Sequence, residues 1–165
     1  MPPAFPADAL DGPWVTCYRF SHGGQVRHHA DIARVTAESA SRIRAVNHPP
    51  EPRSEGRAVP FRNEISAGLA GRHLAGEWRN ISDTRYYGVV ELAVLPGETV
   101  MMGGYYGVGS DIEVSAGSWK WVRLDAGDAP LDGITLREPA ELYDLVMSHA
   151  QNDVPLILAE VREGS

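Results

Sequence analysis

The chain has 165 residues, of which 43% are hydrophobic and 22% are charged, values typical of one soluble globular domain with its own core. The formal net charge of −7 and the pI near 5.3 argue against nucleic acid or an anionic membrane as a partner, because both attract basic proteins. We expect a reduced, cytoplasmic protein. Cys17 is the single cysteine, the first residues do not resemble a signal peptide, and no run approaches the ~20 apolar residues of a membrane span.

Eight segments show the alternation, or the β-branched and aromatic content, that is typical of strands. They cover residues 14–21, 25–37, 41–48, 63–70, 72–81, 84–96, 99–109 and 112–124. The Pro- and Ala-rich residues 1–12 form an N-terminal extension that we expect to lie over the surface. Residues 49–62 are rich in proline and charge, which predicts a mobile loop.

The C-terminal part changes to helical periodicity. Apolar residues and a histidine recur at three- and four-residue spacing between residues 139 and 150, and Pro139 suits the first turn of a helix. Residues 154–161 predict a last strand, and Pro155 favours an edge or barrel-closing position for it. Because closure removes exposed strand edges, we predict a mainly all-β fold, an antiparallel barrel of eight to nine strands with one helix outside.

The first strand and its end partner resemble the lipocalin/calycin superfamily. Gly12-Pro13-Trp14 matches the G-x-W of that family's first strand, and Arg123 lies where the family places a basic residue over this tryptophan. The helix followed by a final strand is also the family's ending. The resemblance implies one calycin-like domain over residues 13–165, structural roles for Trp14 and Arg123, and a ligand in the barrel.

A second resemblance covers residues 74–121, which are similar to an uncharacterised barrel domain of actinobacterial proteins that is often fused to helix-turn-helix regulators. The pattern of that domain is L-x-G-x-W, Y-x-G, M-x-G-x-aromatic-x-G and G-x-W. It is matched by Leu74, Gly76, Trp78, Met102, Gly104, Tyr106, Gly117 and Trp119. This likeness implies sensing or binding. In architecture alone the chain also resembles small barrel cyclases of bacterial natural-product pathways.

Aromatic residues spread over five strands predict a ligand pocket, because alternate residues of a barrel strand face its axis. The residues we expect to line it are Tyr18, His28, Trp78, Tyr105, Trp119 and Trp121. Small neighbours, mostly Gly, Ala and Val, favour a pocket over a filled core. We expect no cofactor and no metal, since the histidines lack the spacing of metal ligands.

An ionisable group in this lumen could move a proton in a cyclisation, which positioning of the substrate alone can also accelerate. Candidates for a general acid or base are His28, Glu77 and Glu91, and the alternative is that both glutamates face solvent. Cys17 is out of phase with Trp14, so we interpret it as packing rather than as a nucleophile.

We therefore predict that the protein binds a small, largely apolar or aromatic molecule. The alternatives are a metal-free cyclase or isomerase that folds a flexible substrate, and a domain that docks another protein. A homodimer is compatible with each of them.

Overall fold

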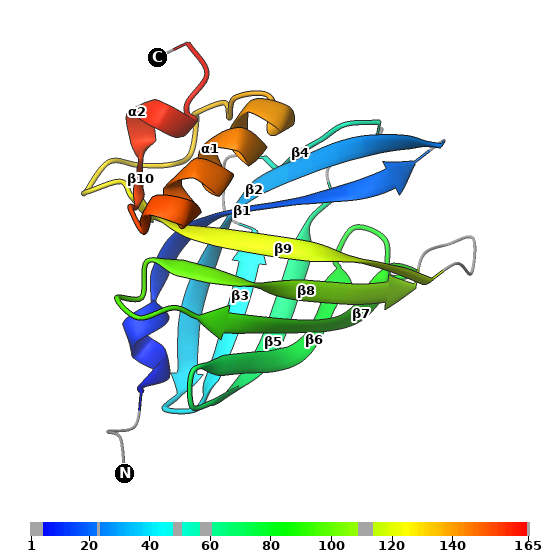
Figure 1. The fold of residues 1–165 in the computed structure, drawn as a ribbon. Helices are drawn as coiled ribbons and strands as arrows, with labels where there is room; N and C mark the ends of the chain where they lie inside the picture. The colour runs from blue at the N-terminus through cyan, green and yellow to red at the C-terminus, as the bar shows by residue number, and fades with distance from the viewer. Residues whose placement is uncertain (1–4, 23, 48–50, 57–60, 109–113, 165) are drawn as a thin grey trace.

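Eight antiparallel strands form a closed barrel, in which each strand pairs with the next and β1 also pairs with β9. The computed structural model describes residues 5–22, 24–47, 51–56, 61–108 and 114–164 (Figure 1). Its strands are β1 Gly12–His22, β2 Gln25–Ser39, β3 Arg42–Asn47, β4 Arg53–Ser54, β5 Asn63–Ala70, β6 His73–Asn80, β7 Tyr87–Val94, β8 Val100–Val108, β9 Val114–Asp125 and β10 Leu156–Ile157. β4 and β10 are additions outside the barrel path. The predicted all-β barrel with an outer helix is confirmed.

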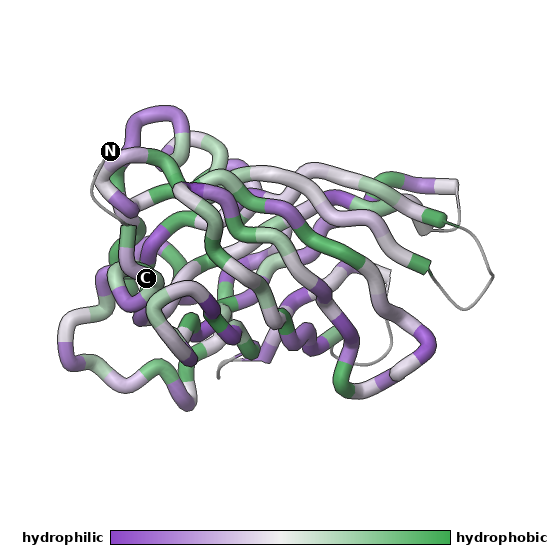
Figure 2. The backbone as a smooth tube through the Cα atoms, turned by 90° about the horizontal axis from the view of Figure 1, so that it is seen from below, coloured by the Kyte–Doolittle hydropathy of each residue, from purple (hydrophilic) through white to green (hydrophobic). Residues whose placement is uncertain are grey.

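The strand register decides which side chains face the barrel axis. Trp14 lies opposite Ala33 on β2 and opposite Arg123 on β9, and paired residues of neighbouring strands share a face. Hydrophobic and hydrophilic residues alternate along the strands (Figure 2). The inward residues form one buried cluster, and the outward residues of β1, β2 and β9 belong to a second cluster beneath the C-terminal helix.

The helix α1, Pro139–Asn152, covers the outer face of β1, β2 and β9 (Figure 1). Leu142 and Val146 are fully buried against Val15 and Val122 of the outer cluster. The helix ends at Asp153, whose left-handed backbone (φ 53°) lets its N–H bond back to the last turn. A short helix, α2 (Leu158–Val161), follows β10. Among the described residues, no helix is long and apolar enough to cross a membrane.

The N-terminal segment closes one end of the barrel, so the prediction that residues 1–12 drape over the surface is wrong for the described part. The 3₁₀ helix η1, Ala7–Leu10, buries Leu10 completely, and the Leu10 carbonyl accepts a hydrogen bond from Trp14 Nε1 at 2.9 Å. Arg123 lies with its Cζ 4.5 Å from the centre of the Trp14 ring. Its guanidinium also donates to the carbonyls of Ala9, Asp11 and Glu98.

Two predicted segments differ from the structure. Within 49–62, which we predicted to be a loop, Arg53–Ser54 pair with β2 and Phe61 is buried among the inward residues, while residues 49, 50 and 57–60 lie outside the described part. The predicted strand 154–161 is limited to Leu156–Ile157, which pair parallel to β9 before α2 begins. The barrel is closed by β1 and β9 rather than by this segment.

Replacement of Trp14 by alanine is expected to lower the free energy of unfolding by about 3–5 kcal/mol, because it empties a buried site and removes the ring beneath Arg123. Urea unfolding followed by circular dichroism measures the effect. Tyr106→Ala is the matched control, since its ring is 55% exposed and its loss should change stability by less than ~1 kcal/mol. Equal stability of the Trp14 variant and the wild type would contradict the assigned role.

Cys17 gives a second prediction, because burial raises the pKa of its thiol from an ordinary 9.0 to about 12. The thiol ionises first in the unfolded chain, so its contribution to stability is complete below pH 9.0 and is lost as the pH rises toward about 12. The difference in unfolding free energy between the wild type and Cys17→Ala should therefore shrink over this range. Urea titrations at about pH 8 and about pH 10.5 test this, and a constant difference would refute it.

Candidate functional site

The lumen has two chemically different halves. The closed half, beside η1 and the β7–β8 turn, is apolar and is lined by Trp14, Val35, Ile43, Leu74, Leu92, Val94 and Met101. The opposite half, toward the β1–β2 and β6–β7 connections, carries rings and polar groups. Its inward residues include Tyr18, His29, Asp31, Phe61, Trp78, Tyr105 and Trp119. Aromatic and polar groups are therefore concentrated in this half, which we call the open half only to distinguish it from the end that η1 closes.

A wall of aromatic rings crosses the open half. Tyr18 meets Tyr105 and Trp119 edge-on, with ring centres 5.1 and 5.6 Å apart. Tyr105 in turn lies 6.4 Å from Trp78, in a T-shaped arrangement. Edge-to-face contacts of this kind hold each ring in one orientation. The wall thus presents fixed aromatic faces and edges to anything that enters the lumen.

Glycines let Trp78 lie flat against the sheet. Trp78 on β6 is opposite Gly88 on β7, and Gly88 is opposite Gly107 on β8. A Cβ atom on Gly107 would overlap the six-membered ring of Trp78, and one on Gly88 would come within 2.8 Å of its Nε1. The absence of side chains at both positions therefore sets the orientation of Trp78.

A buried polar row lies beside the ring wall. His29 Nε2 is 2.5 Å from Asp31 Oδ2, and Thr16 Oγ1 donates to the other carboxylate oxygen at 3.1 Å. His29 Nδ1 forms a short contact with Ser54 Oγ on β4. The Tyr18 ring stacks on His29 at 4.6 Å, with an interplanar angle of 19°. His29 and Asp31 are no more than 1% exposed, so the row is held away from bulk water.

Three tryptophans of the lumen carry indole N–H groups that lack an acceptor. Trp78 Nε1, Trp119 Nε1 and Trp121 Nε1 are buried and find no hydrogen-bond partner among the described residues. A buried donor without an acceptor costs about 1–3 kcal/mol. These groups are the natural contact points for an oxygen or nitrogen acceptor in the lumen.

The structure brings together most of the predicted pocket residues. Tyr18, Trp78, Tyr105, Trp119 and Trp121 all point inward. Whether they contact a ligand stays a prediction.

The predicted acid–base residues lie elsewhere. Glu77 and Glu91 are exposed on the outer face, as in the alternative given for them. His28 is also outside, where its Nδ1 lies 2.8 Å from Glu55 Oε1 and its ring meets Tyr143 of α1. Among the described residues, no three His, Cys, Asp or Glu side chains are placed to hold a metal ion.

Sequence reasoning missed His29, Asp31 and Ser54. A signal for the first two existed in the β1–β2 hairpin. Because β1 ends at His22 and β2 begins at Gln25, the residue numbers of each cross-strand pair add up to 47, which places Tyr18 opposite His29. Placing Trp14 inward then places His29 and Asp31 inward as well. Ser54 carried no comparable signal, because its pairing with β2 is long-range.

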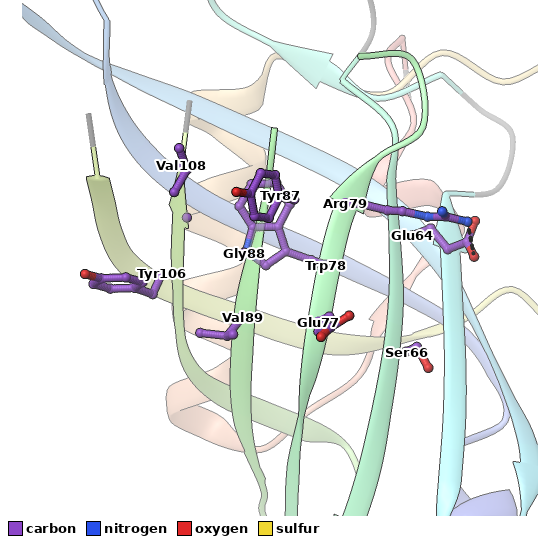
Figure 3. A pocket seen from close by; sticks show the side chains of 11 residues that line it. Glu64, Ser66, Glu77, Trp78, Arg79, Tyr87, Gly88, Val89, Tyr106 and Val108 are labelled. Atoms are coloured by element: carbon purple, nitrogen blue, oxygen red, sulfur yellow. Dashed lines mark hydrogen bonds and ion pairs between the residues drawn. The ribbon is translucent and has the colours of Figure 1, made fainter. Parts of the chain in front are cut away.

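A concavity of about 580 Å³ lies on the outer face of β5–β8 (Figure 3). Tyr87, Val89 and Tyr106 project from it, and Arg79 reaches across to Glu64 at 3.3 Å. Glu77 also lines this surface. Its charged groups are exposed or part-exposed, and Arg79 and Glu64 pair with each other, so this surface would bind a charged ligand only weakly in water. We therefore place the candidate site in the lumen and not here.

No family model matches the sequence, and no curated protein matches it significantly. One solved structure with a similar fold is a redesigned β-barrel. It shares 17% identity and a TM-score of 0.46, over 72% of this chain and 96% of that chain. The two family resemblances therefore remain hypotheses.

Gly107→Ala is expected to lower the free energy of unfolding by about 1–3 kcal/mol and to change tryptophan fluorescence, because the new methyl group displaces Trp78. Gly68→Ala is the control, since its Cβ would lie 3.5 Å from the nearest side-chain atom, an ordinary contact. Thermal unfolding of both variants tests this. Equal losses at the two glycines would contradict the close packing of Trp78.

Proposed function

We propose that the protein binds a small, flat, largely aromatic molecule in the open half of the barrel. Aromatic ligands stack on, or meet edge-on, rings such as Tyr18 and Tyr105. Tyr105 is half-buried, and its hydroxyl donates to the Arg19 carbonyl at 3.1 Å, so the ring is held in place at the side of the lumen. Fixed rings reduce the entropy lost when a ligand is ordered.

The observation that carries this proposal is the set of three unpartnered indole N–H groups, in particular those of Trp119 and Trp121. A ligand with an acceptor oxygen at Trp119 or Trp121 would satisfy a donor that is buried without a partner in the described part of the chain. An entirely apolar ligand would leave that donor unsatisfied. We therefore favour a ring system carrying a carbonyl, carboxylate or sulfonate.

A second candidate function is proton transfer in a cyclisation or isomerisation. The observation in its favour is the His29–Asp31 pair, since a carboxylate that accepts one imidazole N–H orients the ring, and the other ring nitrogen, in contact with Ser54 Oγ, can accept a proton. The aromatic wall would hold a flexible substrate in a reactive shape. A barrel fold by itself does not decide between binding and catalysis.

The lipocalin/calycin resemblance supports the binding proposal through Trp14 and Arg123, whose stacked arrangement is the one that the resemblance implies. The likeness concerns architecture at the closed end. It does not name the ligand, and the second resemblance adds only a sensing or binding role.

Titration with 1-anilinonaphthalene-8-sulfonate, an aromatic probe with acceptor oxygens, tests the proposal. We expect saturable binding that Trp119→Phe weakens by about tenfold, because the ring is kept and one hydrogen bond of about 1.4 kcal/mol is lost. Tyr106→Ala, on the outer face, should leave the affinity unchanged. Loss of binding in the Tyr106 variant with full binding in the Trp119 variant would overturn the proposal.

A further inference from the structure

We infer that Ser54, His29 and Asp31 act as nucleophile, base and orienting carboxylate in the hydrolysis of small carboxylic esters. The inference rests on the proposed function, because the acid or alcohol part of the ester would occupy the same aromatic wall. It goes beyond that function in assigning a covalent reaction and its nucleophile.

The hydrogen bonds indicate which ring nitrogen of His29 carries the proton. An Asp31 carboxylate only accepts, so the contact of 2.5 Å places the imidazole proton on Nε2 of His29. Nδ1 then presents its lone pair to the hydroxyl of Ser54. Thr16 donates to the second oxygen of Asp31 at 3.1 Å and fixes the carboxylate. A nucleophile in contact with a base, and a base oriented by a third group, is the arrangement that activates a serine.

The two-residue strand β4 holds Ser54 in this position. Arg53 donates to the Leu136 carbonyl at 2.8 Å and to Glu138 at 2.7 Å. On the other side, Glu55 accepts from the His28 N–H at 2.6 Å and donates its own N–H to the His28 carbonyl at 3.0 Å. Alternation along the strand turns these anchors outward and Ser54 toward His29.

The base and the carboxylate are more deeply buried than the nucleophile, as the reaction requires. His29 and Asp31 are fully buried, whereas Ser54 is only half-buried. A substrate can therefore approach the hydroxyl while the base and carboxylate stay shielded from water. The Cys17 side chain faces the opposite side of the sheet, and burial raises the pKa of its thiol to about 12.

The reaction balances without a further reactant besides water. Ser54 Oγ bonds to the ester carbonyl carbon as its proton passes to His29 Nδ1, and the carbonyl oxygen takes the negative charge. Breaking the C–O bond returns that proton to the leaving alcohol and leaves an acyl-serine. Water, deprotonated by His29, then attacks the acyl carbon and releases the acid and Ser54.

Diisopropyl fluorophosphate and p-nitrophenyl acetate test this on the full chain. We expect the fluorophosphate to phosphorylate Ser54 with release of fluoride, the site being located by peptide mass spectrometry, and p-nitrophenol release to fall by about 100-fold or more in Ser54→Ala. Ser66→Ala is the matched control, because this serine lies exposed on the outer face of β5 and accepts a hydrogen bond from Arg42. It should keep both the labelling and the rate.

The outcomes separate the two proposals. Absence of both Ser54 labelling and Ser54-dependent hydrolysis, in a protein that still binds the anilinonaphthalene probe, overturns the triad and leaves the binding function standing. Labelling that survives in Ser54→Ala assigns the reaction to another residue and also overturns it. Unchanged thermal unfolding of Ser54→Ala shows that a lost rate is a loss of chemistry and not of fold.

Discussion

The pairing of β1 with β9 is the contact on which the rest of the molecule depends. It closes the sheet, and its register sets Trp14 opposite Arg123 and Tyr18 opposite Trp119. A shift by one residue would turn every inward side chain of β1 outward. The Arg123 guanidinium opposes such a shift, because it lies over the Trp14 ring and bonds to carbonyls of η1 and of the β7–β8 turn.

Apolar burial at the closed end of the barrel offsets the free-energy cost of burying polar groups at the other end. The closed half buries apolar side chains and the whole of Trp14, and this burial stabilises the fold. The open half contains a buried His29–Asp31 pair and unpartnered indole N–H groups, and both reduce stability unless they are satisfied. Groups of that kind are retained at binding and catalytic sites, where a ligand or a reaction uses them.

Most of the fold could be predicted from local pattern, and only part of the site. Alternation in each strand revealed the eight barrel strands, and helical spacing around Leu142 and Val146 revealed α1. The error at His28 and His29 came from choosing a face for β2 without using the register of its hairpin with β1. Ser54 was beyond local reasoning, because a two-residue strand in a Pro-rich segment has no period of its own and is held by Arg53 and Glu55.

The sequence by itself determined the barrel, the outer helix and most of the aromatic residues that turn inward, because a period of two residues and glycine turns are local properties. Only the tertiary structure decided what the lumen can do. It brought Ser54 to His29 from a segment predicted to be a loop, and it turned η1 into the cover over Trp14. Both events depend on pairing between distant segments, whose free energy comes from burial that no short stretch contains.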